Sequence, residues 1–205
     1  TSAAATTTVV VNPTPAAPVA SSSSPDCVGF PIDLFSTTVA GATYSWTGPL
    51  GFTSALEDPT IASAVAGNAG VYSVTVTVSG CTSTAATTTV VVNPTPAAPI
   101  AGNNGPLCEG ATLNLTSNTV AGATYSWTGP LGFSSALEDP TIAGTTIANS
   151  GVYSVTVTVA GCTSAAGTTT VTINSTPVAP VASSNTPVCT GDTIQLFTGF
   201  VAGAT

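Results

Sequence analysis

The sequence contains no lysine, arginine or histidine among its 205 residues, and its eight acidic residues give it a formal net charge of −8. No salt bridge between side chains can therefore form. Binding of nucleic acid through a basic surface is excluded, because neutralising the phosphates requires Lys or Arg. Trypsin-like proteases, which cleave after those two residues, find no site in this chain.

The groups that usually carry catalysis are also scarce. General acid–base chemistry near neutral pH uses His, Lys or Cys, or two carboxylates placed across a cleft. The acids Glu57–Asp58 and Glu138–Asp139 are sequence neighbours, and adjacent side chains on an extended chain point to opposite faces. None of the many serines has a partner base. We therefore expect no enzyme, no catalytic residue and no cofactor.

Long apolar runs are missing too, although 43% of the residues are apolar. No stretch approaches the roughly 18 to 20 consecutive apolar residues that a membrane helix needs, so we expect no membrane span. Disorder is not expected either, because the apolar residues are numerous and are spaced with a period of two.

What the sequence does contain is a long internal repeat. The stretch TYSWTGPLGF at residues 43–52 recurs unchanged at 124–133, and residues 1–81 match residues 82–162 at 59 of 81 positions without a gap. A fixed period of this length indicates a tandem array. We expect the last strand of a preceding module at residues 1–12, whole modules at 13–93 and 94–174, and the first part of a further module at 175–205. The chain then represents a window from a longer array.

The local patterns predict β-strands throughout. VYSVTVTV at residues 71–78 alternates large apolar with small polar side chains, as a half-buried strand does. Ser79–Gly80 predicts a hairpin turn, and residues 82–92 predict the return strand. The NPTP segments predict extended linkers, because proline cannot donate to a β-ladder. Short strands between Gly, Pro and Asn turns are typical of a β-sandwich.

Three segments resemble parts of immunoglobulin-like domains. EGATLNLTS at 109–117, Trp127 in TYSW and NSGVYSV at 149–155 resemble a B strand, the C-strand tryptophan and a tyrosine-corner F strand, and Trp46 and NAGVYSV at 68–74 repeat the last two in the first copy. With the NPTP segments, the chain is similar to tandem Ig-like and PKD-like repeats of giant secreted surface proteins of Bacteroidota, including gliding-motility adhesins. The resemblance implies an all-β fold of tandem immunoglobulin-like sandwich modules of 81 residues in a linear rod outside the cell.

The aromatic residues have a structural explanation. Trp46 lies two residues from Tyr44 on the same predicted strand, so the two side chains share one face. We expect Trp46, Trp127, Tyr72 and Tyr153 in the core, with Trp46 packed against Tyr72 across the sandwich.

The five cysteines depart from the immunoglobulin pattern. Where antibody domains carry their buried disulfide, this chain has Ser36 and Val74 in the first copy and Ser117 and Val155 in the second. The resemblance places Cys108 and Cys162 at opposite poles of one sandwich, about 23 Å apart along a strand of seven residues, which is too far for a disulfide.

The resemblance therefore favours a bond between modules, Cys27–Cys162, with the partners of Cys81, Cys108 and Cys189 outside the sequence given. Two alternatives stay open. Pairs within each copy, Cys27–Cys81 and Cys108–Cys162, would need a different course for the first strand. Reduced cysteines are disfavoured by the regular number per module, which outside the cell is typical of disulfides.

Calcium is the metal ion that the acidic side chains could bind. Ca²⁺ takes six to eight oxygen ligands, and Glu57, Asp58 or Asp26 could supply some of them. The sequence has no Asp-x-Asp spacing of the EF-hand kind, and Asp26 is replaced by Leu107 in the next copy. We expect no metal site, with solvated acids near turns as the preferred interpretation and a Ca²⁺ site as the alternative.

Two hypotheses of function follow. The first is a structural repeat region, the stalk of a cell-surface adhesin or extracellular filament, whose partners are neighbouring modules and like chains. The second is a module that binds a glycan or another surface ligand through Trp46, Trp127 or loop residues 21–24 and 101–104.

Overall fold

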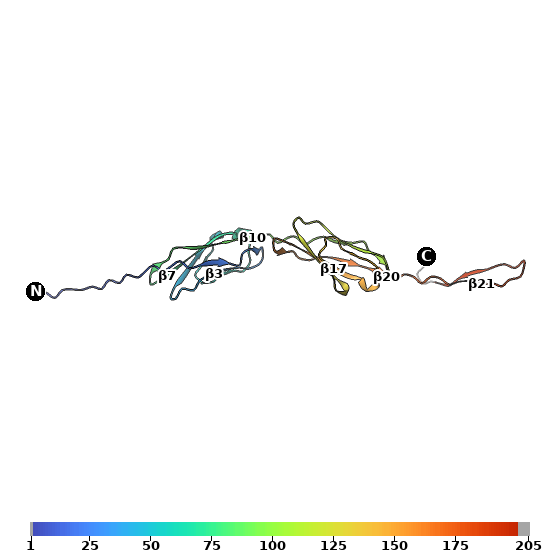
Figure 1. The fold of residues 1–205 in the computed structure, drawn as a ribbon, viewed down its shortest axis with the longest axis horizontal. Coiled ribbons are helices and arrows are strands. Elements are labelled where there is room, and N and C mark those ends of the chain that lie inside the picture. The colour runs from blue at the N-terminus through green and yellow to red at the C-terminus, as the bar shows by residue number, and fades with distance from the viewer. Residues whose placement is uncertain (1, 201–205) are drawn as a thin grey trace. The chain divides into compact units, whose positions relative to one another are not determined.

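A computed structural model describes residues 2–200 (Figure 1). The fold of these residues is all β, and their helical elements are 3-10 turns of three residues. The chain forms two compact units. One consists of the residues up to Ala97 together with Val157–Ala165, and the other of Ala98–Thr156 together with the residues from Ala166 on. The module boundaries expected at Asn12/Pro13, Asn93/Pro94 and Asn174/Ser175 stay predictions.

The first repeat, residues 13–93, contains ten short strands and two turns. They are β1 (Ala20–Ser22), β2 (Asp26–Cys27), β3 (Ile32–Ser36), β4 (Thr43–Thr47), η1 (Pro49–Gly51), β5 (Thr53–Ser54), β6 (Thr60–Ile61), η2 (Ala66–Asn68), β7 (Gly70–Val78), β8 (Cys81–Thr82), β9 (Ala86–Val90) and β10 (Val92–Asn93).

The second repeat, residues 94–174, contains the same elements in the same order, and two further strands follow it. The elements of the second repeat are β11 (Ala101–Asn103), β12 (Leu107–Cys108), β13 (Leu113–Ser117), β14 (Thr124–Gly129), η3 (Pro130–Gly132), β15 (Phe133–Ser135), β16 (Thr141–Ile142), η4 (Ile147–Asn149), β17 (Gly151–Val159), β18 (Cys162–Thr163), β19 (Gly167–Val171) and β20 (Ile173–Asn174). The two further strands are β21 (Ala182–Ser184) and β22 (Leu196–Thr198).

In the first repeat the strands form two sheets and a short parallel pair. One sheet has the order β1-β3-β6, and the other has the order β5-β4-β7-β8 with β9 also on β7. Strand β2 pairs in parallel with β10. The second repeat has the matching sheets β11-β13-β16 and β15-β14-β17-β18, and its parallel pair is β12 with β20.

The core of the first repeat lies between its two sheets. Tyr72, Val74 and Val76 of β7 are buried, whereas Ser73 and Thr75 between them are not, as the alternating sequence predicts. Burial of a side chain of this size contributes roughly 1.5 to 3 kcal/mol. The core also contains residues from β3, β4, β9 and the segment before η2: Ile32, Leu34, Tyr44, Trp46, Ala64 and Val90.

Two expectations about the sheet that contains β7 need correction. Trp46 does not face Tyr72 across the sandwich, because β4 and β7 are neighbours in one sheet and Trp46 pairs with Val74. Both aromatic side chains extend from that sheet into the core. The return strand expected at residues 82–92 is also interrupted between Thr82 and Ala86, where the chain forms a β-bulge.

Candidate functional site

One disulfide links a cysteine of the first repeat to a cysteine of the second repeat. Cys27 is the last residue of β2, and Cys162 is the first residue of β18, directly after the Ala160–Gly161 turn. The two sulfur atoms are 2.00 Å apart and the Cα atoms 5.7 Å apart. Both residues belong to the first compact unit. The favoured pairing from the sequence is therefore confirmed, and the alternative pairs Cys27–Cys81 and Cys108–Cys162 are wrong.

The turn before Cys162 explains its position. Ala160 and Gly161 both have positive φ, 48° and 83°, which is the backbone of a type I′ hairpin turn. The same geometry occurs at Ser79 and Gly80, with φ of 49° and 81°, so the hairpin predicted there is confirmed. Each turn presents the cysteine that follows it at the end of a hairpin.

Asn93 is a member of this site that the sequence analysis missed. Its side-chain Nδ2 donates a hydrogen bond to the carbonyl oxygen of Ala160 over 3.0 Å, and its own carbonyl oxygen lies 3.9 Å from the Cys162 Sγ. A second contact is made by Thr95, whose hydroxyl donates to the carbonyl of Val28 over 2.9 Å. An asparagine recurs at 12, 93 and 174, and that recurrence was the available signal.

The polar side chains before Cys27 bind groups within the first repeat. The Ser24 hydroxyl accepts a hydrogen bond from the N–H of Val91 over 2.7 Å, and the Ser23 hydroxyl donates to Asp26 Oδ1 over 2.8 Å. Asp26 Oδ2 is buried and has no hydrogen-bond partner. A shallow groove lies beside the disulfide, lined by Pro25, Asp26, Cys27, Phe30, Gly161 and Thr163.

The remaining cysteines are unpaired within residues 2–200. Cys81 is partly buried, and its Sγ donates towards the carbonyl oxygen of Asn12 over 3.5 Å. Cys108 and Cys189 are exposed. Cys108 occupies in β12 the position that Cys27 occupies in β2, and it pairs with Asn174 as Cys27 pairs with Asn93.

The aromatic side chains considered for ligand binding lie in the core. Trp46 and Trp127 have 0% exposure, and each indole Nε1–H donates over 3.1 Å to a backbone carbonyl, of Glu57 and Glu138 respectively. A buried indole cannot stack on a sugar ring. These two residues therefore offer no platform to a ligand.

Tyr72 and Tyr153 form the tyrosine corners of the two repeats. The Tyr72 hydroxyl donates to the carbonyl of Asn68, and the Tyr153 hydroxyl to that of Asn149, each over 3.0 Å. Burial raises the pKa of both hydroxyls above the ordinary value of 10.0.

The loops considered for glycan binding use their polar groups internally. Asn103 donates from Nδ2 to the Thr169 hydroxyl over 2.6 Å and to the Thr170 carbonyl over 3.1 Å. Asn104 donates to the Thr112 carbonyl over 3.1 Å and accepts from the N–H of Asn114 over 2.8 Å. In segment 21–24 the Ser23 and Ser24 hydroxyls are engaged as described above.

The acids also have local partners. Asp58 Oδ1 accepts from the N–H of Ser36 over 2.8 Å, and Glu57 Oε1 accepts from the hydroxyl of Thr38. Asp139 repeats the first contact on Ser117, and Glu138 the second on Thr119. Among residues 2–200 no three His, Cys, Asp or Glu side chains are grouped as a metal site would require.

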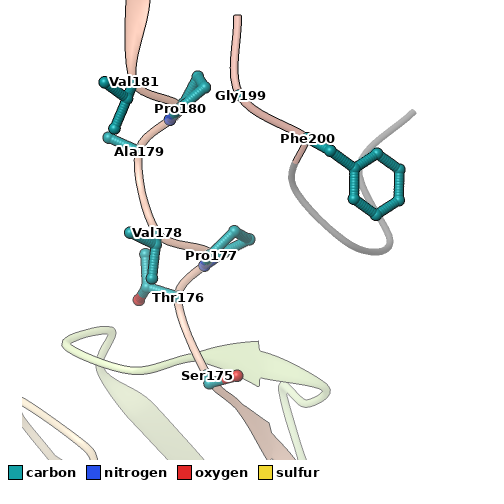
Figure 2. A pocket seen from close by; sticks show the side chains of 9 residues that line it. All are labelled: Ser175, Thr176, Pro177, Val178, Ala179, Pro180, Val181, Gly199 and Phe200. Atoms are coloured by element: carbon teal, nitrogen blue, oxygen red, sulfur yellow. The ribbon is translucent and has the colours of Figure 1, made fainter.

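A further hollow lies at the end of the described chain. Figure 2 shows its lining, which is the segment from Ser175 to Val181 together with Gly199 and Phe200. Phe200 and Val178 are 94% and 82% exposed. The lining residues lie outside the strands, and the hollow is open to solvent.

The sheet order, the buried tryptophan on β4 and the tyrosine corner at the start of β7 define the class: an all-β protein of immunoglobulin-like β-sandwich repeats. In the part of the chain that the structure describes, no helix is long and apolar enough to cross a membrane.

No protein-family model matches the sequence, and no curated protein matches it. Among solved structures, the chain is similar to murine CEACAM1b at 13% identity, covering 78% of this chain and 100% of that one with a TM-score of 0.43. It is similar to domains 3–5 of Drosophila OTK at 16% identity, covering 74% and 57% with a TM-score of 0.42.

A third similarity is to three N-terminal domains of the highly immunogenic outer capsid protein of bacteriophage RB49, at 18% identity, covering 91% and 70% with a TM-score of 0.36. Each TM-score is below 0.5, so the assignment of the fold rests on the strand pairing described above.

Proposed function

We propose that this chain is a load-bearing repeat region, the stalk of an extracellular adhesin or filament of the Bacteroidota surface-protein kind. The observation that carries the proposal is the disulfide Cys27–Cys162, which links cysteines of consecutive repeats that are 135 residues apart in sequence. Such a bond lets tension pass through sulfur atoms when the enclosed backbone unfolds. The disulfide also supports a secreted location for the stalk, because structural disulfides persist in oxidising compartments.

The charge composition supports the same function. With no Lys or Arg, the chain offers trypsin-like proteases no cleavage site, and its acids are engaged within their own repeats. The negative charge of −8 favours solubility of a long repetitive chain over non-specific association. Like chains in a filament would then have to associate through uncharged surfaces.

Single-molecule force spectroscopy tests the proposal. When the chain is pulled from its two ends with the disulfide intact, the residues between Cys27 and Cys162 cannot extend. Reduction should release their contour length, roughly 460 Å for 135 residues at about 3.4 Å each. The Cys162→Ser variant should show the full length without reductant. Equal contour lengths before and after reduction would mean that the bond carries no load.

Ligand binding is the competing function. The observation in its favour is that differences between the repeats cluster at residues 21–37, which include Asp26 and Phe30 beside the groove at the disulfide. Their counterparts are Leu107 and Ala111. A glycan array separates the functions: binding that is lost in the double variant Asp26→Leu, Phe30→Ala would favour a ligand-binding module over a stalk.

A further inference from the structure

The two sulfur atoms of the cross-link differ in their access to solvent. Cys162 is 1% exposed, and its Sγ lies 3.9 Å from the carbonyl oxygen of Asn93. Cys27 is only partly buried, and it lines the shallow groove together with Phe30, which is 56% exposed. A thiolate that opens a disulfide attacks one of its two sulfur atoms, and access decides which one. The groove therefore gives a thiol access to the Cys27 side of the bond.

The carboxylate of Asp26 gives this groove its charge. Asp26 belongs to the lining, and its Oδ1 accepts a hydrogen bond from the Ser23 hydroxyl over 2.8 Å, whereas its Oδ2 is buried without a hydrogen-bond partner. The sequence has no lysine, arginine or histidine that could neutralise the charge. An incoming thiolate is itself an anion, so the carboxylate repels it unless the same molecule also carries a positive charge.

Hydrogen bonds hold the two cysteines in place independently of the sulfur–sulfur bond. Strand β2 is held on the β10 segment by two backbone bonds of 3.0 Å, one of which runs from the N–H of Val28 to the carbonyl of Asn93. Asn93 also ties the hairpin that bears Cys162 to the same segment, because its Nδ2 donates to the Ala160 carbonyl over 3.0 Å. When the bond between the sulfur atoms opens, both cysteines therefore stay on one segment, at a Cα separation of 5.7 Å that suits a disulfide.

We propose that Cys27 is the thiol-accepting half of a reversible cross-link, that Cys162 is the half that closes it again, and that Asp26 selects thiols that carry a cationic amine. The chemical class of the ligand is a small aminothiol, and thiols whose other groups are carboxylates form the disfavoured class. The inference goes beyond the proposed function, because it concerns where the bond opens and not whether it bears load.

The covalent step is a thiol–disulfide exchange. The thiolate of the aminothiol attacks the Cys27 Sγ, a bond forms between these two sulfur atoms, the Cys27–Cys162 bond breaks, and Cys162 leaves as a thiolate that takes up a proton. Closure is the reverse step, in which the Cys162 thiolate attacks Cys27 and the aminothiol leaves. Closure needs no further oxidant, because the mixed disulfide keeps the oxidation level of the original bond.

The carboxylate is not required for the strand pairing around the cross-link. In the second repeat Leu107 occupies the position of Asp26, and β12 pairs with β20 in the register in which β2 pairs with β10. The variant Asp26→Asn should therefore keep the fold, so that its chemistry can be compared with that of the wild type. The matched control is Asp58→Asn, because Asp58 binds the N–H of Ser36 and does not line the groove.

The first test locates the mixed disulfide. The free thiols of the whole chain are alkylated with iodoacetamide, and the chain is then exposed briefly to cysteamine, quenched in acid, unfolded and treated with N-ethylmaleimide. Mass spectrometry of a chymotryptic digest should find cysteamine on the Cys27 peptide and maleimide on the Cys162 peptide. The reverse arrangement should be at most about a tenth as abundant, because access favours one sulfur atom.

The control for this test is the same treatment of the chain in urea, where unfolding exposes both sulfur atoms and the preference should vanish. An even distribution in the folded chain, or cysteamine mainly on Cys162, would overturn the proposal. A preference that persists in urea would overturn it as well, because the cause would then be the local sequence and not the groove.

The second test compares the opening rates with two thiols of opposite charge, cysteamine and mercaptopropionate. The ratio of the cysteamine rate to the mercaptopropionate rate should fall about fivefold in Asp26→Asn at low ionic strength, the effect of one unit charge a few ångströms from the reacting sulfur. Asp58→Asn should leave the ratio unchanged. A ratio that Asp26→Asn does not alter, including equal acceleration of both thiols, would overturn the selection by charge.

The closing step has a separate readout. The mixed disulfide isolated in acid should close on return to neutral pH in a first-order reaction that releases cysteamine. Asn93→Ala should slow this reaction about fivefold, because the hairpin that bears Cys162 loses its hydrogen bond to the β10 segment. Asn174→Ala, at the same position of the next repeat, is the control and should have no effect. A closing rate that Asn93→Ala leaves unchanged would overturn the role given to Cys162.

These outcomes are independent of the force measurement on Cys27–Cys162. A chain whose contour length responds to reduction while cysteamine appears equally on both cysteines keeps the proposed function and loses the thiol-accepting site. A chain that shows the preference for Cys27 without a change in contour length keeps the site and loses the load-bearing role.

Discussion

The indole of Trp46 has no exposed surface, and its Nε1–H is satisfied by the Glu57 carbonyl at 3.1 Å. The side chain thus contributes buried apolar area and completes one buried hydrogen bond. In the second repeat Trp127 has the same burial and the same kind of bond. At this scale the repeated tryptophan is explained by packing.

The first prediction concerns this residue. Trp46→Ala should lower the free energy of unfolding of the first repeat by about 3 to 5 kcal/mol, because it leaves a large cavity. For a sandwich of this size, such a loss approaches the whole stability. Urea denaturation measures it, with Ser45→Ala on the outward face of the same strand as the control. A loss below about 1 kcal/mol would contradict the packing account.

The second prediction concerns the two corner tyrosines. Because the folded-state pKa of Tyr72 and Tyr153 is raised above 10.0, folding keeps these hydroxyls protonated. Their contribution to stability is fully present below pH 10 and is lost as the pH rises through the folded pKa values. Absorbance at 295 nm should show both ionising later than free tyrosine. The variant Tyr72→Phe should remove one of these late steps, and an unchanged titration would contradict the assignment.

At the scale of the element, a bulge shapes the return strand that follows β7 and its counterpart that follows β17. Thr77 pairs with Thr82 and Val74 with Ala86, so three residues oppose two on β7. Ser83 is buried there, and its hydroxyl accepts from the N–H of Val76 over 3.1 Å while its N–H donates to the Val76 carbonyl over 2.9 Å. The serine replaces a ladder acceptor that the bulge removes.

The third prediction follows from this bulge. Ser83→Ala should cost about 1 to 3 kcal/mol, because it leaves the buried N–H of Val76 without a partner. The exposed neighbour Thr84→Ala is the control and should change little. Ser164→Ala tests the same element in the second repeat, where Ser164 bonds to Val157 over 3.1 Å. Hydrogen exchange at the Val76 amide should accelerate, and unchanged protection would contradict the role given to Ser83.

The repeated stretch TYSWTGPLGF is explained at this scale as a packing element. A Cβ added at Gly48 would lie 2.4 Å from the Tyr72 ring, and Phe52 meets that ring edge-on with centroids 5.5 Å apart. Leu50 holds a left-handed backbone with φ of 55°. Gly48 and Phe52 thus have packing reasons to recur, and neither reason requires a ligand.

Sequence alone could predict the strands with strict alternation, since Tyr72, Val74 and Val76 have a period that only one face of a sheet can satisfy. It could not predict the bulge at Ser83, because serine is compatible with an outward-facing strand position. It also placed Trp46 and Tyr72 on opposite sheets, since alternation fixes the face of a residue but not which strands are neighbours.

For the whole molecule, the covalent link is the main long-range constraint. Cys27 and Cys162 were predicted as partners because an immunoglobulin-like course puts the cysteines of one copy at opposite poles. The hydrogen bond from Asn93 to the Ala160 carbonyl was not predicted, since an asparagine before proline is equally typical of an ordinary linker. The chain has no side-chain salt bridge to add to this link, because it has no cation.

The fourth prediction concerns that link. Cys162→Ser should lower the free energy of unfolding by about 5 kcal/mol, the chain-entropy estimate for closing a loop of 135 residues. Cys27→Ser should give a similar loss, and the double variant should add little to either, as expected for two halves of one bond. Cys189→Ser, at an exposed unpaired thiol, is the control. Additive losses would mean that the two cysteines act separately.

The central claim is that the cross-link joins consecutive repeats. Mass spectrometry of a non-reduced digest tests it most directly, with chymotrypsin used because the chain has no tryptic sites. The account predicts one linked pair of peptides that contain Cys27 and Cys162, separable by reduction. A linked pair that contains Cys27 and Cys81, or Cys108 and Cys162, would contradict it.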